Sequence, residues 1–145
     1  YLRKWLVWLE HTGPSGLGPI PELRVVNVQA PTAELRPSEA KQTDEDDLMP
    51  YDVLELIEQA AIRDKRPPLD VLYVLRAAKP DVPEDVRRAW VKRFHRLFAQ
   101  NQWKRERYAP GFHVDDENLD PKTWCRFPIL SGNFEAELED LDALP

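Results

Sequence analysis

The stretch over residues 100–128 gathers side chains that could bind a planar, charged molecule. It holds two tryptophans, Trp103 and Trp124. Two cations, Lys104 and Arg105, directly follow the first tryptophan. Aromatic faces attract cations, and both groups together suit a planar, anionic ligand such as a nucleotide. Residue chemistry leaves two interpretations open: a ligand-binding corner, or a solvated helix end followed by a loop that its aromatic residues anchor.

Other signatures of catalysis or metal binding are missing from the sequence. There is no glycine-rich phosphate loop, and no Ser or Cys nucleophile lies beside a candidate base. The acidic run at residues 115–118 lacks the glycine and the terminal glutamate spacing of a calcium loop. His95 lies beside an apolar stripe, where a packed or surface histidine is commoner than a ligand. We therefore predict no catalytic residue and no metal site in this chain.

Composition narrows the classes of protein that fit. The single cysteine, Cys125, excludes an internal disulfide and agrees with a reducing, cytoplasmic location. No apolar run approaches a membrane span, and no secretory signal is present. The net charge of −6 argues against a general nucleic-acid binder, although residues 84–108 carry eight Lys/Arg against three acids. We expect neither a nucleic-acid nor a membrane partner.

Apolar spacing and fourteen prolines predict a mainly α chain with long loops. The last predicted helix is strongly acidic, so we expect it to be exposed. The predicted helices cover residues 1–11, 50–63, 69–78, 83–105 and 133–141. The valines of residues 23–28 predict one β-strand. Because a lone strand leaves its backbone groups unpaired, we expect this orphan strand to belong to a sheet outside the chain.

Residues 30–48 show no apolar periodicity and form a long predicted loop. Loops of this length are typically lids or disordered segments. The carboxylate run at residues 44–47 could hold Mg²⁺, but such a run is more often solvated or lies at a helix N-terminus. From its residues alone, the sequence therefore predicts a helical accessory module with a lid-like loop and a cationic, aromatic corner.

Two stretches of the sequence resemble the C-terminal part of bacterial glutamine-dependent NAD⁺ synthetases. The first runs APTAELRP at residues 30–37 and continues through TDEDDLMPYDVL at residues 43–54. It is similar to the family's mobile active-site loop and the helix after it. The second runs QWKR at residues 102–105 and WCRFP at residues 124–128. It is similar to a late Lys-Arg turn and the segment that follows. The resemblance covers roughly residues 20–134, in the family's order.

The resemblance implies a fold class and a domain organisation. The fold would be mainly α, a helical C-terminal segment of an α/β, Rossmann-like ATP-pyrophosphatase domain, with one orphan strand and long loops. Residues 1–29 would end the α/β domain with a helix and its last strand. Residues 30–48 would be the mobile lid, and residues 49–145 the helical region with the basic, aromatic motif. The family's phosphate loop and nitrilase-type glutaminase domain have no counterpart here, and Cys125 does not match its nucleophile.

The resemblance also implies an activity for the parent protein. The family is a ligase that amidates deamido-NAD⁺ to NAD⁺ with ATP, Mg²⁺ and glutamine-derived ammonia. The remainder of the synthetase would be this chain's partner and would hold ATP and Mg²⁺, and the parent would be a homo-oligomer. The chain alone would then be inactive. The alternative is a stand-alone helical interaction module without catalysis.

Particular residues match positions of the family motifs. Thr32 matches the loop position used toward ATP, where its hydroxyl could donate to a phosphate oxygen. Glu34, Leu35 and Arg36 belong to the implied lid. Trp103 and Lys104 match the position that reaches deamido-NAD⁺, and Lys104 has a purely structural alternative as a helix C-terminal cation.

Overall fold

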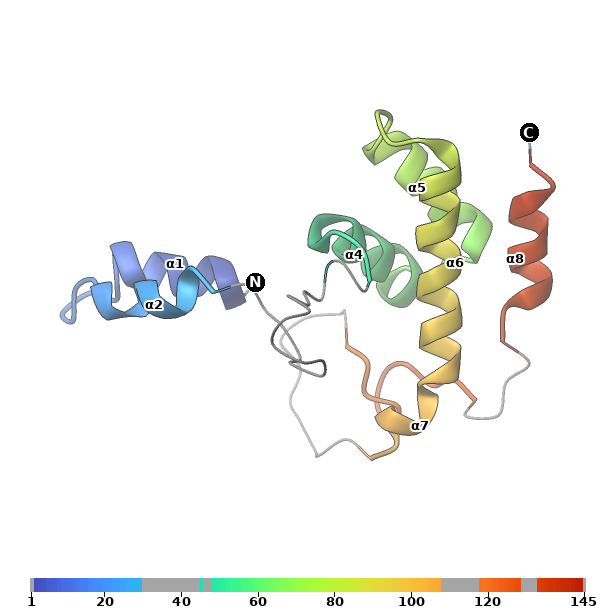
Figure 1. Cartoon of the computed structure of the whole chain (residues 1–145). Helices are drawn as coiled ribbons and strands as arrows, with labels where there is room; N and C mark the ends of the chain where they lie inside the picture. The colour runs from blue at the N-terminus through green and yellow to red at the C-terminus, as the bar shows by residue number, and fades with distance from the viewer. Residues whose placement is uncertain (1, 30–44, 46–47, 108–117, 129–132, 145) are drawn as a thin grey trace, which may run out of the picture. The chain divides into compact units, whose positions relative to one another are not determined.

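The computed structural model describes residues 2–29, 45, 48–107, 118–128 and 133–144 of the chain. The regular secondary structure among them is helical, with no strand (Figure 1). The mainly α fold class is therefore confirmed. The chain divides into two compact units, Tyr1–Asp44 and Glu45–Pro145. No helix within the described ranges is long and apolar enough to cross a membrane.

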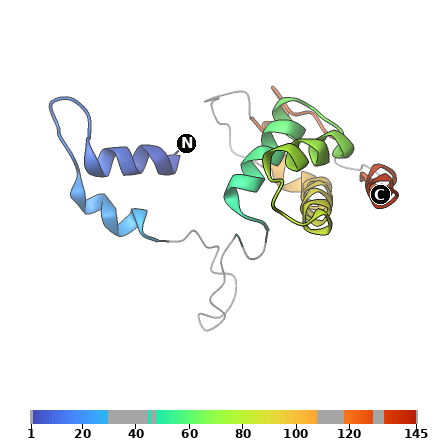
Figure 2. The ribbon, with the colours of Figure 1, turned by 90° about the horizontal axis from the view of Figure 1, so that it is seen from above.

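The first unit is a pair of helices joined by a glycine-rich turn. Helix α1 (Leu2–His11) is followed by the 3₁₀ helix η1 (Pro21–Leu23) and by the short helix α2 (Arg24–Asn27), which lies beside α1 (Figure 2). Gly13 has a φ of +68°, and a Cβ there would lie 1.6 Å from the carbonyl oxygen of Gly18. Only glycine fits this turn, because a side chain would meet backbone that cannot move away.

The predicted strand at residues 23–28 is wrong. Residues Arg24–Asn27 form α2, and the Val28 N–H donates to the carbonyl oxygen of Arg24 at 3.1 Å. A lone strand would leave these backbone groups unpaired, whereas a helical turn pairs them locally. The valines predicted a strand through their β propensity, which is weaker than the need to satisfy the backbone.

The second unit contains the remaining helices, and three of them begin where a proline fixes the backbone. Pro50, Pro67 and Pro83 stand directly before α4, α5 and α6, with φ of −53°, −68° and −55°. The helices predicted from residues 50, 69 and 83 are confirmed, except that the longest one ends earlier. The elements are α4 (Tyr51–Glu58), the π-helical turn η3 (Gln59–Arg63), α5 (Pro68–Ala78), α6 (Glu84–Gln100), α7 (Gln102–Arg105) and α8 (Glu135–Asp142).

The core of this unit lies around α5, which packs against α4, α6 and α8. On α6 the fully covered side chains are Val91, His95 and Ala99. The larger side chains of the predicted stripe on this helix, Trp90 and Phe94 among them, are half-buried. The buried core comprises Met49, Val53, Ile57, Ala60, Val71, Leu72, Leu75, Val91, Leu138 and Leu141.

Most acidic side chains of helix α8 are exposed, as predicted, but the helix is also docked on the core through two leucines, which the sequence did not predict. Leu138 and Leu141 are both 0% exposed. The acidic side chains of α8 meet the basic face of α6: Arg96 pairs with Glu135 at 2.9 Å, and Lys92 pairs with Asp142. The eight basic residues counted in the sequence therefore meet, in part, the acids of the same chain.

Glu84, the first residue of α6, collects three guanidinium groups. Its carboxylate accepts hydrogen bonds from Arg76 at 2.5 and 2.9 Å, from Arg87 at 3.2 Å and from Arg88 at 3.1 Å. The hydrogen bonds from Arg76 contribute most to lowering the pKa of Glu84 to about 2. This cluster ties the C-terminal half of α5 to the beginning of α6.

The Glu84 cluster predicts an acid-sensitive contribution to stability. Because the folded pKa of about 2 lies below the ordinary value of 4.5, the contribution is complete above pH 4.5 and is lost as pH falls toward 2. Glu84→Gln should lower the free energy of unfolding by about 1–2 kcal/mol at pH 7, after allowance for solvent at this partly exposed side chain.

Urea unfolding of the chain at pH 7 and pH 3 measures this effect, and Asp85→Asn, one residue further along α6, is the control. The difference between wild type and Glu84→Gln should shrink at pH 3. A difference of the same size at both pH values would contradict the assignment.

Candidate ligand-binding site

Trp103 and Lys104, the two residues predicted to contact deamido-NAD⁺, lie on α7, the short helix that follows α6. The chain leaves α6 at Asn101, whose side-chain amide donates to the carbonyl oxygen of Leu97 at 2.8 Å. The buried Gln102 donates to the carbonyl oxygen of Phe98 at 2.6 Å. Two amide side chains thus satisfy carbonyl groups at the end of α6 and let a new helical turn begin. This break presents Trp103 at the surface.

Trp103 forms an exposed cationic, aromatic corner with Lys104 and Arg107. Its side chain is 49% exposed. The Lys104 ammonium lies 5.7 Å from the ring centroid, and the Arg107 guanidinium carbon lies 5.2 Å from it. Within the described part of the chain, no carboxylate pairs with either cation. The corner therefore offers an aromatic face and two positive charges to an anion.

Arg105, between these cations in sequence, has a different role. Its Nε donates to the carbonyl oxygen of Leu119 at 2.9 Å, and its other nitrogens donate to the Gln102 side chain and the Cys125 carbonyl oxygen. Its guanidinium carbon also lies 5.4 Å from the Phe98 ring centroid. Each of its three guanidinium nitrogens donates inside the protein, so Arg105 positions α7. The spacing of these residues in the sequence does not distinguish Arg105 from Lys104 and Arg107.

Arg105 holds the segment of residues 118–128, and Asp120 stabilises a turn within that segment. The Asp120 carboxylate accepts the Thr123 hydroxyl at 2.5 Å and the Lys122 N–H at 3.0 Å. Its carbonyl oxygen accepts the N–H groups of Trp124 and Cys125 at 3.1 and 3.0 Å. An aspartate that caps a turn in this way is a common local motif, which the sequence analysis did not single out.

Trp124 is not part of the corner that Trp103 forms with Lys104 and Arg107. The cation over its ring is Lys65, whose ammonium lies 5.0 Å from the centroid. Lys65 itself adopts a φ of +54°, at the turn before α5. The structure thus separates the two tryptophans into two roles: Trp103 is exposed beside Lys104 and Arg107, and Trp124 is covered by another segment.

His95 belongs to a row of packed rings under α8. It is 2% exposed, and its Nδ1 lies 2.8 Å from the carbonyl oxygen of Val91, so the ring donates there. Its ring meets Phe94 and Phe134 edge-on, at centroid distances of 5.3 and 5.0 Å. Burial lowers the pKa of His95 and keeps it neutral. The prediction that His95 is a packed histidine is confirmed.

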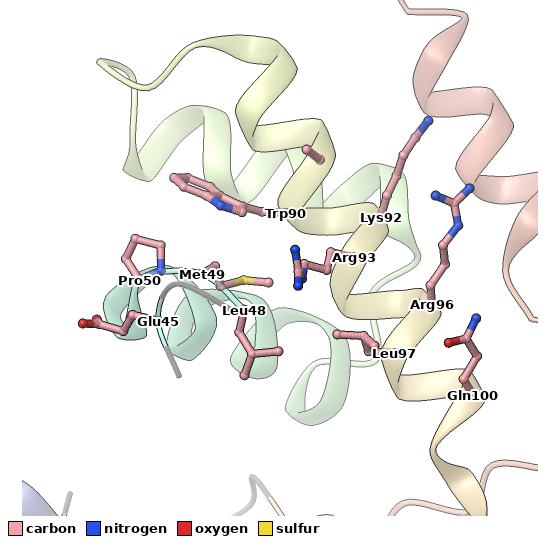
Figure 3. Close-up of a pocket in the computed structure, with 11 residues that line it drawn as sticks. Glu45, Leu48, Met49, Pro50, Trp90, Lys92, Arg93, Arg96, Leu97 and Gln100 are labelled. Carbon is pink, nitrogen blue, oxygen red and sulfur yellow. The ribbon is translucent and has the colours of Figure 1, made fainter. Parts of the chain in front are cut away.

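A groove of about 700 Å³ runs between the start of α4 and the middle of α6 (Figure 3). Arg93 points into it from α6, between Trp90 and Leu97. Its lining mixes apolar and cationic side chains, and the sequence analysis did not identify it. The lining residues are Glu45, Leu48, Met49, Pro50, Ala89, Trp90, Lys92, Arg93, Arg96, Leu97 and Gln100.

The predicted lid falls largely outside the described residues. Thr32, Glu34, Leu35 and Arg36 all lie there, so their implied roles stay predictions. Glu45 is described, and its carboxylate accepts the N–H of Tyr51 at 2.9 Å. This carboxylate therefore caps the beginning of α4, which agrees with the helix N-terminal interpretation of the acidic run.

Fold and site together define a helical module with a cationic, aromatic corner. Over 97% of its length, the chain is similar to the crystal structure of a glutamine-dependent NAD(+) synthetase from Cytophaga hutchinsonii, with 40% sequence identity and a TM-score of 0.71. The likeness covers 20% of that chain. No protein-family model and no curated protein matches. The resemblance to glutamine-dependent NAD⁺ synthetases is confirmed, and the chain corresponds to a small part of such a protein.

Proposed function

We propose that this chain serves as part of a glutamine-dependent NAD⁺ synthetase and that its cationic, aromatic corner contacts deamido-NAD⁺. The parent protein would be a ligase that converts deamido-NAD⁺ to NAD⁺ with ATP and ammonia from glutamine. The observation that supports the ligand role is the convergence of Lys104 and Arg107 on the exposed Trp103 ring. The 40% identity to a synthetase supports the parent activity.

The chemistry of the corner suits this ligand. Deamido-NAD⁺ carries a pyrophosphate and a nicotinate carboxylate, and it has two planar rings. An ammonium group makes strong charge-assisted hydrogen bonds to such anions, and an indole face stacks on planar rings. Lys104 would bind an anionic group while Trp103 supplies the stacking face. Arg107 would add a second positive charge that no carboxylate of the described chain neutralises.

The rest of the proposal concerns the predicted lid and the remainder of the synthetase. ATP and Mg²⁺ would be held by the remainder of the synthetase, with Thr32 donating toward ATP. Residues 30–48, including Glu34, Leu35 and Arg36, would close over the activated carboxylate and exclude water from it. The parent would be a cytoplasmic homo-oligomer. The isolated chain should form no NAD⁺, and turnover above a buffer blank by the pure chain would contradict this.

The test of the ligand role is Lys104→Ala in the complete synthetase polypeptide. A charge-assisted contact to an anion is worth about 1.5–3 kcal/mol, so the KM for deamido-NAD⁺ should rise about ten- to a hundredfold. The KM for ATP should change little, because ATP is held elsewhere. Lys104→Arg should rescue only in part, since a planar fork does not replace a point charge.

Lys92→Ala is the matched control. Lys92 lies on α6 and pairs with Asp142 of α8 at the surface of the same unit. This variant should leave both KM values unchanged. Equal rises for deamido-NAD⁺ and ATP in Lys104→Ala, or a fall in thermal stability that matches the loss of activity, would assign Lys104 to the fold.

A further inference from the structure

The groove between α4 and α6 contains a guanidinium group that has no carboxylate partner in the described part of the chain. Three cations of α6 line this groove, Lys92, Arg93 and Arg96. Lys92 pairs with Asp142, and Arg96 pairs with Glu135 at 2.9 Å. Among the described residues, no carboxylate pairs with Arg93. Because Arg93 points into the groove (Figure 3), its positive charge is directed at whatever occupies that space.

Glu45, the acid among the lining residues, does not neutralise Arg93. Its carboxylate accepts the N–H of Tyr51 at 2.9 Å and caps α4. Figure 3 shows Glu45 on the α4 side of the groove, with Pro50 and Met49 between it and Arg93. The α6 side of the groove is therefore positive, and it favours an anion.

Apolar side chains form the walls beside Arg93. Met49 is 2% exposed and belongs to the core of the unit, so packing fixes its place in the lining. Trp90 also packs against this core, is half-buried and lines the groove. Leu97 lies one helical turn beyond Arg93 (Figure 3). A groove of about 700 Å³ with apolar and aromatic walls and a few polar groups has the size and composition of a small-molecule site.

We propose that this groove binds a mononucleotide, with the phosphate on Arg93 and the base against the indole ring of Trp90. A guanidinium group donates two parallel hydrogen bonds to a phosphate, and an indole face stacks on a planar base. Trp90 and Arg93 are three residues apart on α6, so they are neighbours on the helix surface and one small molecule can reach both. Gln100, also in the lining, offers an amide to the hydroxyl groups of the ribose.

The volume of the groove favours a mononucleotide over a smaller aromatic acid. A single ring with a carboxylate would leave most of about 700 Å³ to water, whereas a base, a ribose and a phosphate fill more of it. The groove is separate from the cationic, aromatic corner, because its lining includes none of Trp103, Lys104 and Arg107. The inference therefore depends neither on the ligand role of Lys104 nor on the activity of the parent protein.

Titration of the ¹⁵N-labelled 145-residue chain with AMP, followed by NMR, tests the inference. AMP should shift the indole N–H signal of Trp90 in a saturable way. Adenosine and inorganic phosphate should each bind at least about tenfold more weakly, because each lacks one of the two contacts. Phosphate that binds as tightly as AMP would identify an adventitious ion only, and would overturn the inference.

Arg93→Gln should weaken AMP binding by about ten- to a hundredfold, since it removes the charge-assisted hydrogen bonds to the phosphate. It should not disturb folding, because the Arg93 side chain is exposed. Lys122→Gln is the matched control, which removes the same charge from an exposed side chain outside the groove and should leave AMP binding unchanged. Trp90→Leu, which keeps an apolar side chain against the core, should weaken the binding of AMP but not of phosphate. Equal dissociation constants in Arg93→Gln and Lys122→Gln would overturn the inference.

The same variants in the complete synthetase polypeptide test whether the groove binds AMP there. Equilibrium dialysis should count one AMP site fewer in Arg93→Gln than in Lys122→Gln, and equal counts would overturn the inference. AMP binding that is lost in Lys104→Ala but kept in Arg93→Gln would place the nucleotide at the corner and would also overturn it. An unchanged KM for deamido-NAD⁺ in Lys104→Ala would reject the ligand role of the corner and leave the groove standing.

Discussion

Replacing Arg105 by alanine should release α7 from residues 118–128 and lower the free energy of unfolding by about 2–4 kcal/mol. Arg105 donates to the Leu119 and Cys125 carbonyl oxygens and to the Gln102 side chain. Hydrogen bonds to a charged group are worth about 1.5–3 kcal/mol, and the variant leaves several acceptors without their donor. It also removes the guanidinium that covers the Phe98 ring.

Amide hydrogen exchange of the chain tests where the effect falls. The Trp124 and Cys125 amides, which donate to the carbonyl oxygen of Asp120, should lose protection. Amides in the core of α5 should keep theirs, because Arg105 contacts none of that helix. Arg105→Lys should not restore protection, since an ammonium group cannot serve three separated acceptors as a planar fork does.

In the complete synthetase, Arg105→Ala should also raise the KM for deamido-NAD⁺, because Trp103 and Lys104 lose their support. Arg107→Ala is the matched control for folding, since Arg107 lies over the exposed face of Trp103. It should leave the protection of Trp124 and Cys125 unchanged. Uniform loss of protection in Arg105→Ala, across α5 and α6 as well, would contradict a local positioning role.

The contrast between Lys104 and Arg105 shows what sequence could and could not predict at the site. The sequence placed both cations beside Trp103, and the structure confirms that Lys104 lies near its ring. Spacing cannot show that Arg105 turns inward, because two of its three acceptors lie on residues 119 and 125, which are 14 and 20 residues further along the chain. Long-range hydrogen bonds of this kind leave no periodic pattern in the sequence.

The helices show the same division between local and non-local information. Prolines and apolar spacing predicted the beginnings of α4, α5 and α6, since both signals act within a few residues. The acidic side chains of α8 are mostly exposed as predicted, but its docking on the core was not predicted, because two buried leucines are too few to reveal a docked face. The valines of α2 misled for a related reason: strand propensity is realised only where a neighbouring strand is present.

The docking of α8 depends on its apolar side chains more than on its charges. Leu138 is 0% exposed in the core with Leu75 and Leu141. Leu138→Ala should therefore lower the free energy of unfolding by about 2–5 kcal/mol, the cost of removing a buried leucine and leaving a cavity. Arg96→Ala, which breaks a pair with Glu135 whose two side chains are both 45% exposed, should cost less than about 1 kcal/mol.

The pKa of His95 measures the docking of α8 independently of the free energy of unfolding. Its ring packs against Phe134 just before α8, and burial lowers its pKa. If Leu138→Ala loosens α8, water should reach His95 and its pKa should rise toward the ordinary value of about 6.5, as measured by NMR titration. The exposed Glu139→Ala on the same helix should change neither quantity. A pKa of His95 that stays lowered in Leu138→Ala, together with a loss of stability no larger than in Arg96→Ala, would show that charge pairing docks α8.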